Sequence, residues 1–596
     1  MEHDGDGDGG SSSSRPINIS QQPHEHDAFV GETSSLSSTV LLDHVGEVSL
    51  TFNSDGLSWK LLGSSDYNET TCLGITLGSK FATEIKFSDV YAAEFINYGI
   101  VHGASILVQN SEMYRFTVHG FERSKTQPSV WALAVYTFGH KDMQICQMWA
   151  NQINDAIKLE VERPKNLMVF IHPRSGKGNG YRIWEMVAPI FSRAKVKTKV
   201  IVTQRAGQAF DVMQSTSNNE LNLYDGVVTV GGDGFFNEIL NGFLKSRHKA
   251  PFPPAPSDFP HSNGVLDSSG VNDLNEVVAE PSQNEDQSPL LPSSKHNGSQ
   301  DASCSTDQDP DLLLPNERFR FGIIPAGSTD AIVITTGARD PITSALQIVL
   351  GKRVCLDIAQ VVRWKLTSVS EVEPYVRYAA SFAGYGFYGD VITESEKLRW
   401  MGPKRYDYAG TKVFLRHRSY QAEIAYLEVK SEESGSPSVS ERVICRVNCK
   451  VCKSKSNRGN RAGCHSTPYS HPGETRWLKS KGRYISVGAA IISNRNERAP
   501  DGLVADAHLS DGFLHLILIK DCPHAYYLWH LTQLARKGGK PLNFKFVEHH
   551  KTPAFTFTSF GNESVWNLDG ERLQAHQLSA QVFQGLVSLF ASGPEV

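Results

Sequence analysis

Residues Leu223 to Gly242 read LYDGVVTVGGDGFFNEILNG, and this stretch determines the expected fold. A short apolar run, Val227 to Val230, is followed by two glycines, Asp233, a third glycine and then Phe235 to Leu244 with apolar residues at helical spacing. The pattern predicts a buried strand, a tight turn and a helix. Such a turn lets backbone N–H groups and a helix N-terminus face an anion. Asp233 would therefore lie where a nucleotide phosphate or an attacking hydroxyl binds, or it would be an ordinary helix cap.

The length and composition indicate a soluble multidomain protein. A chain of 596 residues is too long for one hydrophobic core, and 40% hydrophobic residues are ordinary for globular domains. The net charge of −5 gives no overall case for nucleic-acid binding. No apolar run reaches the roughly 18 residues of a spanning helix, and the start MEHDGDGDGGSSSS lacks the features of a signal peptide. We predict a cytoplasmic protein without a transmembrane segment, bound peripherally to the cytosolic face of a membrane.

The first 160 residues divide into two parts. Residues 1–37 are rich in Gly, Ser, Asp and His and are expected to be disordered. Residues 38–160 contain short strands separated by turns, and they end in Asp142 to Leu159, where apolar residues recur at helical spacing. This pattern predicts an antiparallel β-barrel closed by one C-terminal helix.

The remainder is expected to form an α/β domain followed by a β-rich domain. In residues 161–350, apolar strands separated by helical stretches imply βαβ units and a parallel sheet, interrupted by a disordered acidic insertion at 251–316. Residues 351–596 alternate strands without regular helices between them, which predicts a mainly antiparallel domain. A polar insertion occupies residues 431–481.

Three turns share one property: small residues and a polar side chain follow an apolar strand. They are HPRSGKG at 172–178, GGDG at 231–234 and PAGSTD at 325–330. Because the carboxyl ends of parallel strands meet at one edge of a sheet, the three turns are expected to line a single nucleotide site. The first turn lacks the spacing of a Walker A loop, and none has the GxGxxG pattern of a dinucleotide site.

The order SGKGNG, GGDGF, PAGST and, at 567–571, NLDGE resembles the diacylglycerol-kinase-type lipid kinases, which include the sphingosine kinases. The resemblance extends from about Lys165 to the C-terminus, apart from the insertions. It implies the two-domain fold of that family, with ATP as phosphoryl donor in the crevice between the α/β and β-rich domains.

The N-terminal region, with seven strands and a helix bearing Trp149, resembles a pleckstrin-homology domain. Such domains often bind phosphoinositides through a basic pocket between the first strands. Here the matching hairpin, Phe52 to Lys60, carries little positive charge beyond Lys60. Phosphoinositide binding and a scaffolding or protein-binding role therefore both stay open.

The family resemblance assigns Asp233 as the base that takes the proton from the lipid hydroxyl, with Gly231, Gly232 and Gly234 beside it at the substrate. Without the resemblance, Glu238 would be interpreted as a solvated helix residue, and Arg399 and Arg405 as ordinary surface residues. Mg²⁺ is expected through Asp569 and Glu571, directly or through water, because it prefers oxygen ligands and bridges phosphates. The positions that match nucleotide-binding residues are His172, Pro173, Arg174, Thr203, Gln204, Arg205, Ala206, Gly207, Glu238, Gly327, Ser328, Thr329, Arg399, Arg405, Asp569, Gly570 and Glu571.

Within the family the sequence is most similar to the subgroup that phosphorylates ceramide, and its long polar insertions resemble those of plant members. The resemblance rests on the N-terminal domain, the PAGSTD form of the third turn and a CxxxCxxC run at 445–452. Sphingosine kinases carry an aspartate just before the segment ESEK to meet the charged amine of their substrate. This chain has Ile392 there, as suits the uncharged amide of ceramide, although Asp390 lies close by.

We therefore predict ATP-dependent phosphorylation of the primary hydroxyl of ceramide to ceramide 1-phosphate. The alternatives are a sphingoid-base or diacylglycerol kinase and a non-catalytic membrane lipid-binding protein. Intact Asp233, Glu238, Asp569 and Glu571 argue against the second.

Four of the nine cysteines crowd into one short segment, which indicates a reducing compartment rather than a disulfide framework. Cys445, Cys449, Cys452 and Cys464 supply enough thiolates for a tetrahedral Zn²⁺ site, or they belong to a metal-free structural or membrane-facing loop. Ca²⁺ remains a further candidate, as an activator, on which the sequence gives no information.

Overall fold

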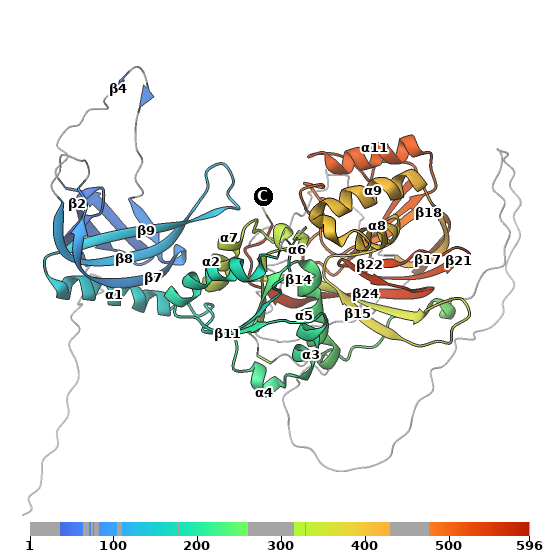
Figure 1. Ribbon diagram of the computed structural model, residues 1–596, viewed down its shortest axis with the longest axis horizontal. Helices are drawn as coiled ribbons and strands as arrows, with labels where there is room; N and C mark the ends of the chain where they lie inside the picture. Colours follow the sequence, from blue (N-terminus) through green and yellow to red (C-terminus); the bar gives the residue numbers. More distant parts are fainter. Residues whose placement is uncertain are drawn as a thin grey trace, which may run out of the picture.

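The computed structural model describes residues 36–62, 71–72, 75–76, 83–103, 110–176, 178–259, 315–316, 318–327, 329–428 and 476–594 (Figure 1). The predicted cysteine site at Cys445, Cys449, Cys452 and Cys464 and most of the predicted disordered segments lie outside these residues.

The N-terminal region forms a seven-stranded antiparallel sheet in the order β6-β3-β2-β1-β9-β8-β7. Helix α1 (Met143–Lys158) packs against it and is capped by Asp142, whose side chain accepts a hydrogen bond from the Gln144 amide. Trp149 of α1 is fully buried and stacks on Phe116. The predicted helix is confirmed, whereas the likeness to a pleckstrin-homology domain stays a prediction. The strands are β1 (Ser37–Leu42), β2 (Gly46–Phe52), β3 (Gly56–Leu61), β6 (Glu84–Lys86), β7 (Val90–Val101), β8 (Ser111–Arg123) and β9 (Trp131–His140), with a separate pair β4 (Thr71–Cys72) and β5 (Ile75–Thr76) and a 3-10 turn η1 (Phe87–Asp89).

The α/β region is built on four parallel strands in the order β11-β10-β12-β13. Every residue of β12 is buried, as expected for a strand covered on both faces. The predicted parallel sheet is confirmed. Its elements are β10 (Asn166–Ile171), α2 (Gly180–Arg193), β11 (Lys197–Val202), α3 (Gln208–Ser215), α4 (Asn218–Leu221), β12 (Gly226–Gly231), α5 (Asp233–Arg247), η2 (Pro256–Asp258), β13 (Arg320–Pro325), α6 (Ala331–Thr335) and α7 (Pro341–Val349).

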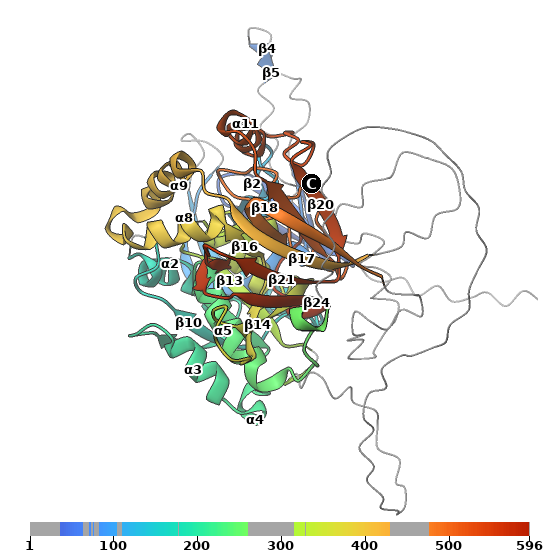
Figure 2. The ribbon, with the colours of Figure 1, turned by 90° about the vertical axis from the view of Figure 1, so that its right-hand side faces the viewer.

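The C-terminal region is rich in antiparallel strands and joins the α/β sheet where β24 runs beside β13, so that both belong to one 15-stranded sheet. Figure 2 shows β17, β18, β21 and β24 of this region together. Its strands are β14 (Val354–Lys365), β15 (Tyr375–Ala379), β16 (Phe382–Gly386), β17 (Tyr420–Glu428), β18 (Arg476–Ala490), β19 (Leu514–Lys520), β20 (Val547–Thr552), β21 (Ala554–Phe560), β22 (Trp566–Leu568), β23 (Glu571–Leu573) and β24 (Gln577–Leu589).

The prediction that this region lacks regular helices is wrong. Helices α8 (Phe387–Glu396), α9 (Arg405–Arg416) and α11 (His524–Ala535) lie together on one side of the C-terminal strands, with the 3-10 segment η3 (Arg399–Lys404) between the first two (Figure 1). Helix α8 follows β16 without a loop, and α9 buries only Ala409 and Val413. Neither helix therefore produces a long apolar stripe in the sequence.

Two predicted insertion boundaries also need correction. The first residues of the insertion at 251–316 are ordered on β24, because the Gln581 and Ser579 side chains donate hydrogen bonds to the carbonyls of Pro251 and Pro254. Strand β18 begins at Arg476, inside the predicted polar segment 431–481, because its residues 476–484 pair with β17.

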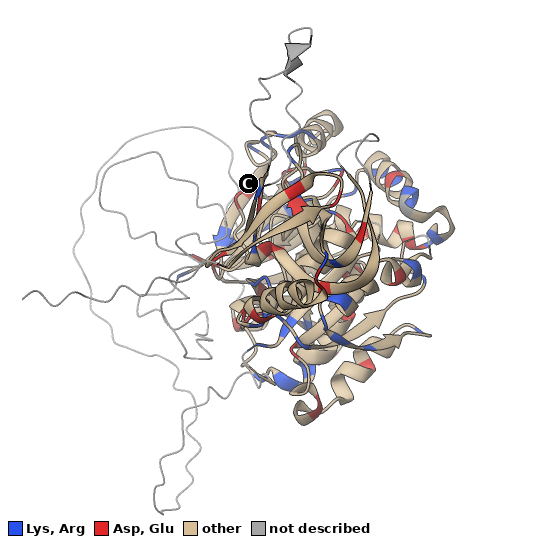
Figure 3. Ribbon diagram, turned by 90° about the vertical axis from the view of Figure 1, so that its left-hand side faces the viewer, with Lys and Arg blue, Asp and Glu red and all other residues tan. Residues whose placement is uncertain are grey.

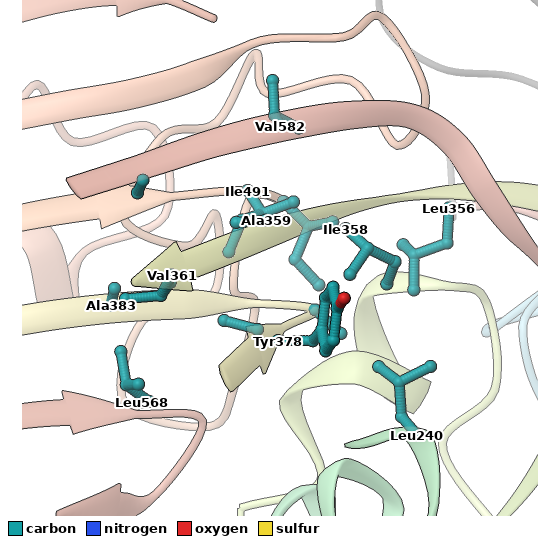
Figure 4. Packing of buried hydrophobic residues seen from close by; sticks show 14 of the residues in the cluster. Leu240, Leu356, Ile358, Ala359, Val361, Tyr378, Ala383, Ile491, Leu568 and Val582 are labelled. Atoms are coloured by element: carbon teal, nitrogen blue, oxygen red, sulfur yellow. The ribbon is translucent and has the colours of Figure 1, made fainter. Parts of the chain in front are cut away.

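The main hydrophobic core spans the junction between the two regions. Leu240 of α5 and Tyr378 of β15 belong to the same buried cluster as Leu356 and Ile358 of β14 (Figure 4). Burying such side chains contributes roughly 1.5–3 kcal/mol each. The core therefore fixes the start of α5, which carries Asp233, relative to the C-terminal strands.

The N-terminal sheet packs directly on the α/β region. The stacked rings of Phe121 and Trp131, with centroids 4.0 Å apart, share a buried cluster with residues of α2 and α7. The Trp131 amide donates a buried 2.9 Å hydrogen bond to the Thr343 hydroxyl of α7, and Arg163 donates to the carbonyls of Val90 and Phe87. The two regions are thus held by apolar contacts and by hydrogen bonds.

None of the helices in the described ranges is both long and apolar enough to span a bilayer. In the view of Figure 3, acidic and basic residues are interspersed along the described chain, in keeping with the small net charge.

Candidate active site

The three predicted turns meet at the carboxyl ends of β10, β12 and β13. A Cβ atom added to Gly327 would lie 2.6 Å from the Gly232 Cα atom, and one added to Gly176 would lie 2.7 Å from the Ala326 carbonyl oxygen. Larger residues would separate the turns, which explains why glycine occupies these positions. The predicted convergence is confirmed, and nucleotide binding at this place stays a prediction.

Asp233 is the first residue of α5, but it does not cap its own helix. Its two carboxylate oxygens accept hydrogen bonds of 2.8 Å from the Ala331 amide and 3.0 Å from the Ile332 amide, at the start of α6. Burial raises the pKa of Asp233 to about 6, and the charge of Asp569 adds to this increase while the two amides oppose it. The carboxyl group is thereby held in place, with a proton affinity suited to general-base catalysis near neutral pH.

Asp330, the last residue of the third turn, is a second half-buried acid beside Asp233. Its carboxylate accepts a 3.0 Å hydrogen bond from the Gly327 amide, and its backbone has φ +49°. Burial and then the charge of Asp233 raise the pKa of Asp330 to about 8. The sequence pattern predicted no role for Asp330, although a carboxylate at the end of a strand-end turn was an available signal.

Asp569 joins the two regions of the molecule. It is 5% exposed, and its oxygens accept five hydrogen bonds: from the Asn237 side chain, from the amides of Ala380, Ser381 and Phe382, and from the Ser381 hydroxyl, at 2.6–3.0 Å. These five hydrogen bonds occupy all the acceptor positions of the carboxylate, which has about four lone-pair sites. The predicted direct contact of Asp569 with Mg²⁺ does not fit this arrangement.

Glu571 and Glu238 are the more accessible carboxylates. Glu571 forms an ion pair with Arg377. Burial raises the pKa of Glu571, Arg377 opposes this effect, and the charges of Glu238 and Asp569 add to it. One Glu238 oxygen accepts hydrogen bonds of 3.0 and 3.3 Å from amides in the first turn of α3. The two glutamates therefore lie close enough to repel each other, an arrangement that a cation would stabilise.

The loop TQRAG follows β11 and leads into α3. The Thr203 hydroxyl is 3% exposed and donates to the Ile171 carbonyl, so it contributes to structure in this conformation. Gln204 donates its amide to the Gln208 side chain, Arg205 is exposed and pairs with Asp211, and Gly207 has φ +77° just before α3. The backbone of this loop, which includes Ala206, is available to a ligand mainly at its exposed outer side.

The first turn begins with His172, whose Nδ1 atom lies 3.1 Å from the Ser175 hydroxyl. Burial lowers the pKa of His172, and the charge of Glu238 opposes that decrease. Pro173 is half-buried and Arg174 is exposed at the rim. Among the described residues of the first turn, Arg174 therefore supplies an exposed cation near the acidic groups.

Arg399 and Arg405 converge, but on an acidic side chain. The Arg399 Nε atom donates to Glu396 at 2.6 Å, and an Arg405 guanidinium nitrogen lies 3.5 Å from the other Glu396 oxygen. Arg405 also donates to the Tyr406 hydroxyl. Arg399 of η3 and Arg405 of α9 therefore both contact Glu396 of α8, and their contact with phosphates stays a prediction.

The remaining predicted positions are Gly570, Thr329, Ser328 and Gly234. Gly570 lies in the tight turn between β22 and β23 and has φ +91°. Its amide donates a hydrogen bond to the Asn567 side chain. Thr329 is half-buried in the third turn, and Ser328 lies outside the described residues. Gly234 lies beside the turn between β22 and β23, since a Cβ atom added to Gly234 would be 3.8 Å from the Asp569 carbonyl oxygen.

Comparison with known proteins matches both halves of this architecture. The family model for the diacylglycerol kinase catalytic domain matches residues 166–256, and the one for the ceramide kinase C-terminal domain matches residues 381–565. A solved structure of a putative diacylglycerol kinase from Bacillus anthracis str. Sterne aligns with a TM-score of 0.41 and 12% identity over 72% of this chain and 97% of that one. The catalytic-domain match, together with the related proteins below, makes the protein a lipid kinase.

The relatives define the family more closely. The chain is 59% identical to the ceramide kinase of Arabidopsis thaliana, over 94% of this chain and 96% of that protein. It is 52% identical to the ceramide kinase of Oryza sativa subsp. japonica, over 94% and 99%, and 32% identical to that of Homo sapiens, over 86% and 89%. The chain belongs to the ceramide kinase family.

Proposed function

We propose that the protein transfers the γ-phosphoryl group of ATP to the primary hydroxyl of ceramide, giving ceramide 1-phosphate and ADP. One observation carries the proposal: the GGDG turn holds the Asp233 carboxylate against the third turn, at the edge of the sheet where three glycine-containing turns meet. A phosphoryl-transfer enzyme mainly needs positioned groups at such a place.

Asp233 takes the proton of the ceramide hydroxyl as its oxygen attacks the γ-phosphorus. The new O–P bond forms while the bond between the γ-phosphorus and the bridging oxygen of ADP breaks. With a pKa of about 6, Asp233 is mostly ionised at neutral pH and is a stronger base than an ordinary aspartate. The amides of Ala331 and Ile332 orient its oxygens without neutralising them.

The nucleotide would bind along the first turn, the TQRAG loop and the third turn. Backbone amides of glycine-containing turns can approach phosphates closely. Arg174 is exposed at the first turn, and Arg399 and Arg405 would have to exchange Glu396 for phosphate oxygens. Arginine suits that exchange because its planar fork matches phosphate geometry.

The acidic residues fit a divalent cation, for which we propose Mg²⁺. Glu571 and Glu238 would hold it, because their mutual repulsion is one cause of the raised pKa of Glu571 and because carboxylate oxygens are the ligands that Mg²⁺ prefers. Asp569 would act by fixing the turn that carries Glu571. When bound, the ion would neutralise charge on the phosphates.

The surroundings of α8 support ceramide over a free sphingoid base. Ile392 is 4% exposed, and the nearby Asp390 carboxylate accepts hydrogen bonds from the hydroxyls of Tyr420 and Ser564. Asp390 is therefore already engaged and is a poor counter-charge for a substrate amine. The amide of ceramide needs none.

We propose a scaffolding role for the N-terminal sheet, which is supported by the hydrogen bonds of Trp131 and Arg163 that connect it to the α/β region. We further propose that the protein works as a peripheral protein on the cytosolic face of a membrane, where its lipid substrate lies. Phosphoinositide binding by this sheet would be tested by sedimentation with vesicles that contain or lack a phosphoinositide.

The proposed reaction is tested on the purified full-length chain with radiolabelled ATP and ceramide, sphingosine or diacylglycerol in mixed micelles. Ceramide should be the preferred substrate, and Asp233→Asn should abolish most turnover. Asp155→Asn, an exposed carboxylate paired with Lys158, is the matched control and should keep wild-type turnover. Near wild-type turnover of Asp233→Asn would refute the base assignment, and a preference for sphingosine or diacylglycerol would refute the substrate assignment.

A further inference from the structure

Two histidines and an aspartate meet at one corner of the N-terminal sheet, far from the three turns in sequence. Asp43 and His44 form the turn between β1 and β2, and His102 follows the end of β7. One potential ligand atom of each residue lies within 4.8 Å of those of the other two. The function proposed above assigns no role to these side chains.

The backbone holds the three residues together. The Asp43 amide donates to the Thr137 carbonyl at 2.9 Å, and the His44 amide donates to the His102 carbonyl at 3.0 Å. The His102 amide donates to the Asp43 carboxylate at 2.7 Å. The two segments are 59 positions apart in the sequence, so the juxtaposition is a product of the fold and not of local sequence.

The three side chains lie within reach of one another. The rings of His44 and His102 stack in parallel planes, with an interplanar angle of 0° and centroids 4.7 Å apart, so one ring has to rotate for both to bind a single ion. The Asp43 carboxylate lies 3.0 Å from His102 Nδ1 and 3.7 Å from His44 Nε2. His44 has φ +61°, in the left-handed region that costs energy for a residue other than glycine. The turn therefore keeps an unfavourable backbone conformation that directs the His44 ring towards its two partners.

We propose that Asp43, His44 and His102 bind one Zn²⁺ ion. Two imidazole nitrogens and a carboxylate oxygen are a common zinc ligand set, and water would complete a tetrahedral site. Imidazole ligands disfavour Mg²⁺ and Ca²⁺, which prefer all-oxygen sites. The side chains are 25%, 71% and 47% exposed for Asp43, His44 and His102, so an ion can reach them from solvent.

The bound ion would join the β1–β2 turn to the end of β7. A metal that binds the folded state alone stabilises it in proportion to the logarithm of its concentration over the dissociation constant. We therefore expect Zn²⁺ to stabilise the N-terminal sheet, independently of the kinase reaction.

The proposal is tested on the chelator-treated full-length chain by titration with Zn²⁺ and, for spectroscopy, Co²⁺. Because Cys445, Cys449, Cys452 and Cys464 could bind either ion, the cobalt spectra separate the two sites: thiolate ligands give an intense sulfur-to-metal charge-transfer band, whereas nitrogen and oxygen ligands do not. One equivalent with nitrogen and oxygen ligands is expected, besides any equivalent with thiolate ligands.

Two variants remove one ligand each. His44→Asn keeps a residue that tolerates the left-handed backbone, and His102→Gln keeps a polar side chain. Each should weaken Zn²⁺ binding at the nitrogen and oxygen site by about tenfold or more and reduce the zinc-dependent increase in melting temperature. The control His140→Gln changes another histidine of the same sheet, whose ring accepts a hydrogen bond from the Asp142 amide, and should bind like the wild type.

The melting temperature and circular dichroism without metal establish that the variants fold. Folded variants that bind Zn²⁺ as tightly as the wild type would refute the site. A cobalt spectrum of the wild type with thiolate ligands alone would also refute it, and the three side chains would then form only a hydrogen-bonded surface cluster.

Discussion

The Asp569 carboxylate accepts a 2.7 Å hydrogen bond from the Asn237 side-chain amide, and so joins residues that are 332 positions apart in the sequence. Asn237 lies one turn after Asp233 on α5, whereas Asp569 lies in the turn between β22 and β23, just before Glu571. Asn237 also donates to the Tyr378 carbonyl at 2.9 Å. This buried contact fixes the proposed base and the proposed metal ligand relative to each other.

Replacing Asn237 with alanine should therefore reduce both stability and activity. The change leaves the Tyr378 carbonyl and one Asp569 oxygen with fewer donors in a buried place, which costs about 1–3 kcal/mol. We expect a lower melting temperature and a lower kcat on ceramide. The exposed Asn222→Ala is the control and should leave both unchanged. A variant with wild-type stability and kcat would show that the contact does not couple the two regions.

The pH dependence of turnover should show the titration of Asp233. Its pKa lies at about 6, above the ordinary value of 3.8, and only the ionised form accepts a proton. The value of kcat/KM should therefore decrease about tenfold for each pH unit below about 6 and level off above it, as measured at saturating ATP. A profile that stays flat down to pH 5 would exclude Asp233 as the base.

Replacing Asp330 with asparagine should stabilise the protein at alkaline pH. Its folded-state pKa of about 8 is higher than the ordinary 3.8, so the folded state retains a proton that the unfolded state has lost. The free energy of unfolding therefore falls as pH rises from about 4 to about 8 because of this residue. Asparagine tolerates φ +49° and can still accept the hydrogen bond from the Gly327 amide. It does not titrate, so this loss of stability with rising pH is absent from the variant.

The measurement is the melting temperature of wild type and Asp330→Asn from pH 5 to pH 8.5. The variant should melt higher at pH 8, and the difference should shrink towards pH 5. Asp211→Asn, at an exposed ion pair, controls for the loss of a carboxylate in general. Equal melting temperatures at pH 8 would mean that Asp330 is ionised at little cost.

The sequence predicted those parts of the site that depend on local pattern. The buried run at Val227 to Val230 and the glycines after it predicted β12, the turn and α5, and parallel strands predicted that the three turns meet. The hydrogen bonds that occupy the Asp569 carboxylate could not be predicted, because the donors Asn237 and Ala380 come from distant segments of the chain. Helix α9 was missed because only Ala409 and Val413 mark its buried side.

The contact between the N-terminal sheet and the α/β region includes one buried hydrogen bond that can be removed selectively. The Trp131 amide donates to the Thr343 hydroxyl, and Trp131 and Thr343 are 4% and 0% exposed. Thr343→Val preserves shape but leaves the amide without its acceptor, at a cost of about 1–3 kcal/mol, whereas Thr343→Ser keeps the hydroxyl. Hydrogen exchange followed by mass spectrometry should show faster exchange at the Trp131 amide in Thr343→Val than in Thr343→Ser or wild type. Because the stacked Phe121 and Trp131 rings remain in place, the sheet should stay folded. Unchanged exchange in Thr343→Val would mean that apolar packing alone holds the sheet on α7.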